Sequence, residues 1–330
     1  MRPARITATM NAKKSLWVAS LSLLFFLGAK GAQAGSLMDI GADCATVGVW
    51  DGNTKTCTLS LDIADPTSIS ITSDNVTLDG AGHALVGGIV VNRFNHTTIK
   101  NLAISGPGAS IDLEYAASTT LDNITTSNNT YGFVLAYSPD TTILNSNIIS
   151  PAGYGLYAYG NIRNLTLRNN HFSELTSLDR SGTYHDNIFL YFPLNQDTDQ
   201  PQNISIDQSN TVDGKTVYYF ENQSNRVFDN LPDAGVFYCV QCDSITLSNT
   251  TFDTTHNKSQ INLYKTTNSI IKGNTVKYGR DYGIYLYESS GNSINGNTFD
   301  TNVTGVESAL SETTFTTKTH FNTTEPWGSN

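Results

Sequence analysis

A spaced set of three apolar residues recurs about every 22 positions along most of this chain. In the first clear set, Ile89 and Val91 are separated by one residue, and Ile99 follows after eight. Two apolar residues that alternate with another residue form the inward side of a short strand, because successive side chains of a strand point to opposite faces. The third residue begins the next inward strand after a turn. The same internal spacing returns in sets that begin at Ile111, Phe133, Phe237, Ile261 and Ile284.

A repeat of this size cannot bury its apolar face alone, so its copies must stack and bury it against one another. Strands that are linked within one coil and run parallel to those of the next almost always wind right-handed. The pattern therefore predicts an all-β chain that folds as a single right-handed parallel β-helix.

Asn and Gly residues fall at the expected corners of the coils. Examples are the pairs at residues 128–129, 169–170 and 273–274. Both residue types tolerate the left-handed backbone conformation that tight corners need. Beyond the first thirty or so residues we find no long segment with the periodicity of a helix.

The first 34 residues have the features of a targeting signal. Basic residues precede an apolar run from Leu16 to about Ala29, and Ala32-Gln33-Ala34 fits a cleavage site. We expect cleavage there and export to the periplasm, the cell surface or the medium. An uncleaved anchor is the alternative, although the apolar run is short for a membrane-spanning helix.

The net charge of the chain limits the classes of molecule that it is expected to bind. The chain has 19 basic and 29 acidic residues, and removal of residues 1–34 takes away five basic residues and no acidic one. The remaining formal charge of −15 disfavours nucleic acid and anionic membranes, which need basic patches. It is compatible with neutral glycans, cations or basic partners.

The repeat register predicts the organisation of the exported part. Residues 35–66 form an N-terminal cap, residues 67–317 form the coils, and residues 318–330 close the far end. Two coils fall at 187–191 and at 203–206 with 217–219. The residues that do not fit the repeat are assigned to inserted loops at about 173–185, 193–202 and 221–234. The sequence does not indicate an oligomeric state.

Four cysteines in an exported chain indicate disulfides first. Cys44 and Cys57 flank a predicted hairpin with its turn near Gly52, and a bridge between them would staple the cap. Cys239 and Cys242 are separated by two residues, as in redox and zinc motifs. The register places Cys239 inward, no helix lowers its pKa, and no second pair completes a zinc site. A core thiol or a local disulfide is the better interpretation.

The outward positions of the same strands predict a ligand surface. Exposed aromatic rings beside carboxylates suit a polysaccharide, because sugar rings lie on flat apolar rings while polar neighbours bind the hydroxyl groups. Cross-strand stacking that only stabilises the sheet is the alternative. The candidate ligand-binding residues are Asp112, Glu114, Tyr157, Tyr159, Tyr238, Tyr264, Tyr285 and Tyr287, and Phe189, Tyr191, Tyr218 and Phe220 extend them.

Three phrases resemble a known family. They are NVTLDGAGHALVG at 75–87, TVDGKTVYYFENQS at 211–224 and DYGIYLYESSGNSINGNTF at 281–299. They are similar to right-handed β-helix proteins of the pectin-lyase-like type with NosD-like or CASH (carbohydrate-binding and sugar hydrolase) domains. The resemblance implies exported proteins, of which some are named for copper-enzyme maturation and others are associated with carbohydrates.

Enzymes related to this family include polysaccharide lyases, glycoside hydrolases and uronate epimerases, so catalysis is weighed as an alternative. The candidate catalytic residues are Tyr184, His185 and Asp186 in one loop, with Arg280 and Asp281 at a second position. Calcium would be a cofactor only in a lyase. Copper delivery has little support, because the six histidines are widely separated. We therefore expect no resident metal or cofactor.

The sequence thus favours an exported, non-catalytic β-helix protein that binds a polysaccharide or a cell-surface glycan. A carbohydrate-active enzyme is the first alternative. A structural surface or periplasmic module is the second, and copper-enzyme maturation is the least favoured.

Overall fold

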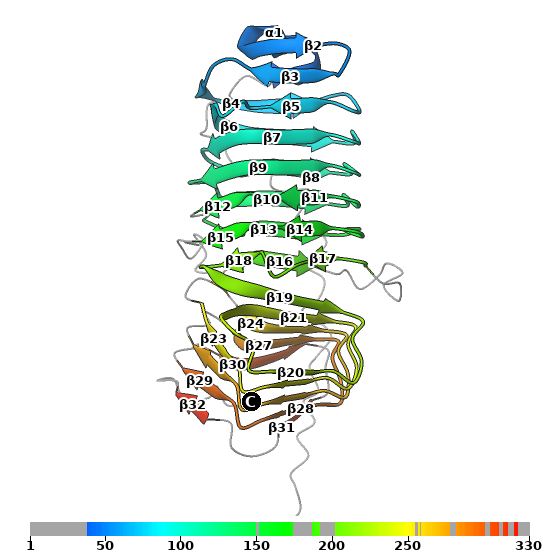
Figure 1. Ribbon diagram of the computed structural model, residues 1–330, viewed down its shortest axis with the longest axis vertical. Helices are drawn as coiled ribbons and strands as arrows, with labels where there is room; N and C mark the ends of the chain where they lie inside the picture. The colour runs from blue at the N-terminus through cyan, green and yellow to red at the C-terminus, as the bar shows by residue number, and fades with distance from the viewer. Residues whose placement is uncertain are drawn as a thin grey trace, which may run out of the picture. The chain divides into compact units, whose positions relative to one another are not determined.

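The computed structural model describes residues 38–149, 152–173, 187–191, 202–254, 257, 259–277, 282–300, 304–309, 313–315 and 320–322. The chain divides into two units, Met1–Gly35 and Ser36–Asn330, and all described residues lie in the second. The described residues form one short helix and a succession of stacked parallel strands (Figure 1). The predicted all-β parallel β-helix is confirmed.

The N-terminal end is closed by a helix and a hairpin. Helix α1 (Ile40–Val47) presents Ile40, Cys44 and Val47 on one face, and all three are buried. Strand β2 (Gly48–Asp51) pairs antiparallel with β3 (Thr56–Leu59), as the hairpin prediction required. The predicted Cys44–Cys57 disulfide is present. It joins the helix to β3, because Cys44 lies in the short helix and not in the hairpin itself.

The first segment, residues 38–212, has three parallel ladders. One contains β1 (Met38–Asp39), β4 (Ile63–Ile71), β6 (Ala84–Asn92), β8 (Ala109–Glu114), β10 (Tyr131–Ala136), β13 (Leu156–Tyr159) and β16 (Ile188–Tyr191). The next contains β3, β5 (Thr77–Asp79), β7 (Thr98–Ser105), β9 (Thr120–Ser127), β11 (Thr142–Leu144), β14 (Thr166–Arg168) and β17 (Ser205–Ile206). The third is formed by the ends of β6, β7 and β9 with β12 (Asn147–Ile149), β15 (His171–Ser173) and β18 (Thr211–Val212).

The second segment, residues 215–322, repeats this arrangement. Its first ladder contains β19 (Lys215–Glu221), β21 (Ala234–Val240), β24 (Ser259–Tyr264), β27 (Tyr282–Tyr287) and β30 (Thr304–Ala309). The second contains β20 (Val227–Asp229), β22 (Thr246–Ser248), β25 (Ile270–Lys272), β28 (Asn292–Asn295) and β31 (Thr313–Phe315). The third contains β23 (Thr251–Asp253), β26 (Thr275–Lys277), β29 (Thr298–Asp300) and β32 (His320–Asn322).

The apolar triplets fill the core as predicted. Ile89, Val91 and Ile99 are fully buried, and so are the corresponding residues of the later sets. Asn128, Asn169 and Gly273 have positive φ angles at the corners. The residue that follows each of them, such as Asn170, is buried and bonds with the neighbouring coils.

The two segments are joined by a hairpin that the repeat pattern does not predict. Strand β18 pairs antiparallel with β19, and Asp213 and Gly214 between them both have positive φ angles. The expectation that residues 217–219 continue the coil of residues 203–206 was therefore wrong. The outer face of the second segment packs against the last coil of the first, where the Tyr238 hydroxyl donates to the Ile188 carbonyl oxygen at 2.6 Å.

The predicted insertions differ in outcome. Residues 174–186 and 192–201, which hold most of the first two, lie outside the described residues. The region predicted as a loop at about 221–234 contains β20, which pairs with β22 as part of a regular coil.

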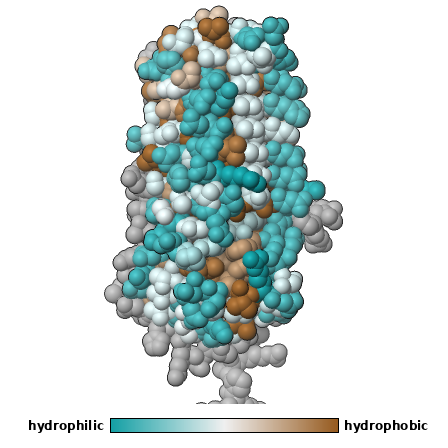
Figure 2. Space-filling model, in the orientation of Figure 1, coloured by the Kyte–Doolittle hydropathy of each residue, from teal (hydrophilic) through white to brown (hydrophobic). Residues whose placement is uncertain are grey.

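The described surface is polar with scattered apolar residues. On the face shown in Figure 2, hydrophobic residues occur in small groups among hydrophilic ones. Val227 on β20 and Ile270 on β25 are the described exposed apolar residues of the second segment. Within the described ranges, no helix has the length and apolar character needed to cross a membrane.

Candidate functional site

The outer face of strands β8, β10, β13 and β16 brings carboxylates and aromatic rings onto one surface. The parallel register aligns two columns of outward side chains across four coils. The first column is Asp112, Val134, Tyr157 and Phe189, and the second is Glu114, Ala136, Tyr159 and Tyr191. Two carboxylates therefore occupy one coil, small residues the next, and aromatic rings the two after that.

Six rings form a continuous group, which we call the aromatic face: Tyr131, Tyr154, Tyr157, Tyr159, Phe189 and Tyr191. The Tyr157 ring lies at its centre, with its centroid 4.8 Å from that of Tyr154, 5.0 Å from Tyr159 and 5.6 Å from Phe189. All six side chains are half-buried. Part of each ring is thus held by neighbouring rings while another part stays accessible to a ligand.

A corner column supports one edge of the aromatic face. Arg93, Tyr115, Tyr137 and Gly160 all have positive φ angles at successive corners. The Arg93 guanidinium carbon lies 5.0 Å from the Tyr115 ring centroid, and the Tyr115 and Tyr137 rings are stacked at 5.1 Å. The Tyr137 ring meets Tyr159 edge-on at 6.1 Å. A Cβ atom on Gly160 would lie 2.7 Å from the Tyr137 ring, so only glycine leaves room for this ring.

The carboxylates have a distinctive electrostatic environment. Burial, and then the nearby Glu114 carboxylate, raise the pKa of Asp112 from 3.8 to about 6. The Asn92 side-chain amide donates a hydrogen bond to Glu114 Oε2 at 2.9 Å. Burial, followed by Tyr157 and the two carboxylates, raises the pKa of Tyr159 to about 12. The Tyr159 hydroxyl therefore keeps its proton at neutral pH and remains a hydrogen-bond donor.

Two of the eight candidate ligand-binding residues are not accessible. Tyr238 and Tyr264 are only 2% and 7% exposed, so the expectation that they are outward and exposed was wrong. The register places them outward from their own coil, but the last coil of the first segment covers that face. They belong to the same buried cluster as the first segment's core. The extension to Tyr218 and Phe220 was also wrong, because these two residues are in register with the inward Phe237 and Cys239.

Tyr285 and Tyr287 lie at the margin of this covered face and are half-buried. Their rings are stacked with centroids 6.4 Å apart, and Tyr285 also stacks on Tyr282 at 5.9 Å. Burial raises the pKa of Tyr287, and the nearby Tyr191 hydroxyl raises it further. Tyr287 therefore lies near the aromatic face of the first segment.

The candidate catalytic residues Tyr184, His185, Asp186, Arg280 and Asp281 lie outside the described residues. Their catalytic role stays a prediction. Of the neighbouring charged residues, Lys277 is described, and its Nζ lies 3.7 Å from Asp253 Oδ2 on the adjacent strand.

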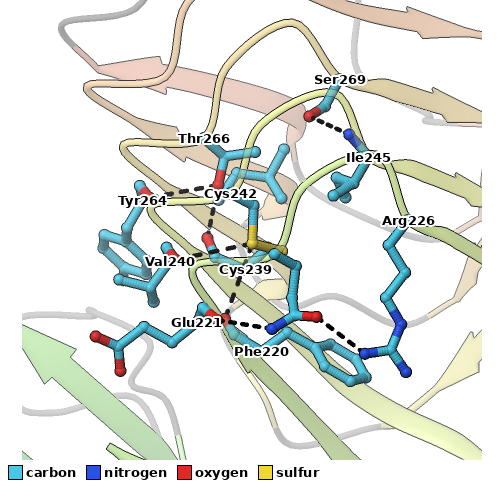
Figure 3. Close-up of a disulfide and its surroundings, with 12 residues drawn as sticks. Phe220, Glu221, Arg226, Cys239, Val240, Cys242, Ile245, Tyr264, Thr266 and Ser269 are labelled. Atoms are coloured by element: carbon cyan, nitrogen blue, oxygen red, sulfur yellow. Dashed lines mark hydrogen bonds between the residues drawn. A yellow bond between two sulfur atoms is a disulfide. The ribbon is translucent and has the colours of Figure 1, made fainter. Parts of the chain in front are cut away.

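Cys239 and Cys242 form the local disulfide that was one of the two interpretations of this pair. Figure 3 shows it at a corner, between Phe220 of the preceding coil and Thr266 of the following one. Cys242 takes the corner position that Ser138 and Ser289 occupy elsewhere, and its sulfur lies 3.7 Å from the Val240 carbonyl oxygen. Both cysteines are buried, so the bond acts as a structural crosslink of the corner.

Two family models match the sequence. A model described as a right handed beta helix region matches residues 63–191, and one described as periplasmic copper-binding protein (NosD) matches residues 183–325. The chain is a parallel β-helix protein with NosD-like features. The resemblance stated from the sequence is thereby confirmed, and no curated protein sequence matches this β-helix protein significantly.

Several solved structures are similar to the β-helix at low identity. The catalytic domain of a GH87 α-1,3-glucanase in complex with tetrasaccharides is 12% identical, with 89% of this chain and 70% of that chain covered and a TM-score of 0.41. An alginate lyase from Paenibacillus sp. is 14% identical, with coverage of 78% and 99% and a TM-score of 0.34. The receptor-binding tailspike of bacteriophage Det7 is 10% identical, with coverage of 83% and 53% and a TM-score of 0.36. Similarities at this level of identity and TM-score do not identify functional residues or a ligand.

Several residues of the site were missed by the sequence prediction. Tyr131 and Tyr154 precede the inward pairs of their coils, and Tyr115 and Tyr137 are corner residues. The signal for the last two was available, because they occupy the same position of the repeat, 22 residues apart. The Asp112 and Glu114 pair and the tyrosines at 157 and 159 were correctly placed on one strand face.

Proposed function

We propose that this protein binds a polysaccharide or cell-surface glycan on the aromatic face, without turnover. The observation that carries the proposal is the arrangement of the Tyr157 and Tyr159 rings two coils away from Asp112 and Glu114 on the same sheet face. Such a surface offers flat apolar area and hydrogen-bonding groups side by side, which is what a sugar ring requires.

The arrangement suggests how a glycan would lie. The C–H face of one pyranose ring would stack on Tyr157, which has accessible area and is held in place by four neighbouring rings. The Tyr159 hydroxyl would donate to a sugar oxygen, and the carboxylates would accept hydrogen bonds from hydroxyl groups. Because strands hold all these groups, little side-chain entropy is lost on binding.

Export of the protein is part of the proposal. Two disulfides lie among the described residues, and disulfides persist in oxidising compartments. The NosD model, which describes a periplasmic protein, supports the same location. An exported protein would meet polysaccharides directly.

A carbohydrate-active enzyme is the second candidate function, and one observation favours it. Asp112 has a pKa of about 6 and shares a strand face with Glu114. A carboxyl group that titrates near neutral pH beside a second carboxylate is suited to general acid–base catalysis of glycosidic bonds. This candidate moves the predicted enzymatic site from residues 184–186 to Asp112 and Glu114 on β8.

Copper delivery finds no support in the described part of the chain. No group of three or more His, Cys, Asp or Glu side chains that could hold a metal occurs there. Soft thiolate ligands suit copper, yet Cys239 and Cys242, which lie within the NosD match, are joined to each other. The metal-binding side chains among the described residues therefore do not form a copper site.

The test is a glycan-array and affinity-gel screen of the purified protein, with reducing-end and unsaturated-uronate assays on every glycan that binds. Binding without new chain ends supports the proposal of non-catalytic binding. New chain ends would favour the enzyme candidate instead. Tyr157→Ala/Tyr159→Ala should weaken retention at least tenfold. Ile270→Ala, an exposed apolar residue on β25, serves as the control and should bind normally. Retention that the double variant leaves unchanged, or no binding by the wild type, would leave the structural-module alternative.

A further inference from the structure

Asp112 and Glu114 form a pair of like charges without a cationic partner in the described part of the chain. The ion pairs there involve other residues. Among the described residues, Asn92 donates one hydrogen bond to the Glu114 carboxylate, and none is donated to the Asp112 carboxylate. The Asp112 side chain is half-buried beside the exposed Glu114 carboxylate, so holding its charge there raises the free energy of the folded protein. Carboxyl groups whose pKa is raised by burial and by a like charge are concentrated at functional sites, which points to a ligand here.

The groups around Asp112 do not compensate its charge. The polar and charged groups around Asp112 come from four strands and the corners that follow them. Strand β8 supplies Glu114 and Tyr115, β6 supplies Asn92 and Arg93, β10 supplies Tyr131 and Tyr137, and β13 supplies Tyr157 and Tyr159. The cation in this set, Arg93, lies over the Tyr115 ring at the corner and forms no ion pair with either carboxylate. Burial raises the pKa of Tyr157 and of Tyr159, so these two hydroxyl groups are neutral at physiological pH.

We infer that the aromatic face selects polysaccharides built from amino sugars with free ammonium groups, and rejects those built from uronates. This inference rests on the proposed function, which it deepens by naming the ligand class. The ammonium group of one sugar would donate hydrogen bonds to Asp112 and Glu114 and neutralise them, while a neighbouring pyranose ring stacks on Tyr157. A uronate carboxylate in the same place would be repelled by both protein carboxylates.

The geometry also sets the pH dependence. The pKa of Asp112 is about 6, so at pH 5 this carboxyl group is mostly neutral and at pH 7 it is mostly ionised. The site therefore gains about one negative charge between these two pH values. Affinity for a cationic glycan should therefore rise from pH 5 to pH 7 for as long as the sugar amine keeps its proton.

The inference is tested by calorimetric titration with four probes at pH 5 and pH 7. The probes are a tetramer of β-1,4-linked glucosamine, its fully N-acetylated counterpart, a tetramer of galacturonate, and tetralysine. We expect the glucosamine tetramer to bind at least tenfold more tightly than each of the others at pH 7. Its affinities at the two pH values are compared per protonated amine, because the sugar amines also lose protons as the pH rises, and on this basis the preference should be smaller at pH 5. Tetralysine matches its charge but lacks sugar rings to stack.

Variants separate the contributions of charge and rings. Asp112→Asn/Glu114→Gln should bring the affinity ratio between the glucosamine and N-acetylated tetramers close to one. Asp229→Asn/Asp243→Asn removes two carboxylates on the second segment that hydrogen-bond to neighbouring corners, and should leave this ratio unchanged. Tyr157→Ala/Tyr159→Ala should weaken binding of both sugar tetramers.

The outcomes distinguish this inference from the proposed function. If the N-acetylated or uronate tetramer binds as tightly as the glucosamine tetramer, the charge selection is wrong while glycan binding stands. Equal binding of tetralysine would show that charge alone is recognised, and would overturn the inference. If no probe binds and the array shows no glycan ligand either, both the inference and the proposed function are refuted.

Discussion

At the residue scale, the site depends on side chains whose environment differs from that of the rest of the repeat. Asp112 occupies the same column as Val90 and Val134, two apolar residues, yet carries a carboxyl group. Gly160 ends a corner column in which the other members have large side chains. Both departures from the repeat occur where the aromatic face lies, which is why they mark it.

Asp112→Asn should stabilise the protein at neutral pH. The pKa of Asp112 rises from 3.8 to about 6 on folding, so folding stability falls as the pH increases through this window and stays lower above it. The shift corresponds to at most about 3 kcal/mol, and after allowance for partial solvent exposure we expect a gain of about 1–2 kcal/mol at pH 7.5. Little difference should remain at pH 4. Urea unfolding at the two pH values measures both.

The control for this prediction has the opposite sign. Hydrogen bonds from Ser248 and Asn249 lower the pKa of Asp229, so its charged form is favoured by folding. Asp229→Asn should therefore destabilise the protein at pH 7.5. An Asp112→Asn variant that is less stable than the wild type at this pH would contradict the electrostatic account of the pair.

Gly160→Ala should destabilise the protein and disturb the aromatic face. Its φ angle of +77° resembles the +75° of Gly214, but an added Cβ meets the Tyr137 ring at position 160 and nothing within 4 Å at position 214. We expect a loss of about 1 kcal/mol for Gly214→Ala and about 2–3 kcal/mol for Gly160→Ala. Chemical denaturation of the two variants compares them, and equal losses would show that the ring moves aside freely.

At the scale of the element, the repeat predicts the strands and corners well because each depends on neighbours at a fixed sequence distance. Ile111 and Phe133 are buried and adjacent in the ladder, as their spacing required. Burial of an outward face is different, because it depends on a contact that is not periodic. Tyr238 and Tyr157 fit the outward pattern equally well. Tyr238 is buried and Tyr157 is partly accessible because the second segment packs on the first at Tyr238.

The two disulfides should contribute unequally. Cys44 and Cys57 are 13 residues apart, and Cys239 and Cys242 are three apart. In the chain-entropy account, loss of the longer loop costs about 3 kcal/mol and loss of the shorter about 2 kcal/mol. Cys239→Ala/Cys242→Ser should cost still less, because a serine at 242 can donate to the corner carbonyl groups as Ser138 does.

Guanidinium unfolding of Cys44→Ala/Cys57→Ala and Cys239→Ala/Cys242→Ser measures this order. A larger loss for the second variant would mean that the corner disulfide, and not the cap, is the dominant crosslink. The wild type under oxidising conditions is the reference for both.

At the scale of the whole molecule, the fold could be predicted from the sequence but the relation of its two segments could not. The hairpin between β18 and β19 comes from two residues, Asp213 and Gly214, within a long stretch where the apolar spacing is irregular. Such a turn signal is local, while its effect is to reverse the chain and cover a sheet face. The aromatic face was therefore identified in part, and its limit at the segment junction was not.

Tyr238→Phe tests the junction. Removal of the hydroxyl leaves the buried Ile188 carbonyl oxygen without this donor, which should cost about 1–2 kcal/mol. Tyr218→Phe is matched to it, because the Tyr218 hydroxyl donates to Pro232 within the second segment. Hydrogen exchange should quicken at residues 187–191 in the first variant only. Equal exchange at these residues in the two variants would argue against the junction.

The hairpin has a further consequence for self-association. A stack of parallel coils has no intrinsic length, since its last coil offers a row of unpaired backbone groups to any strand that arrives. In this protein the chain turns back at Asp213 and places its own flank over the end of the first stack. The same reversal that removes Tyr238 from the accessible outer face thus also ends the first stack at its last coil.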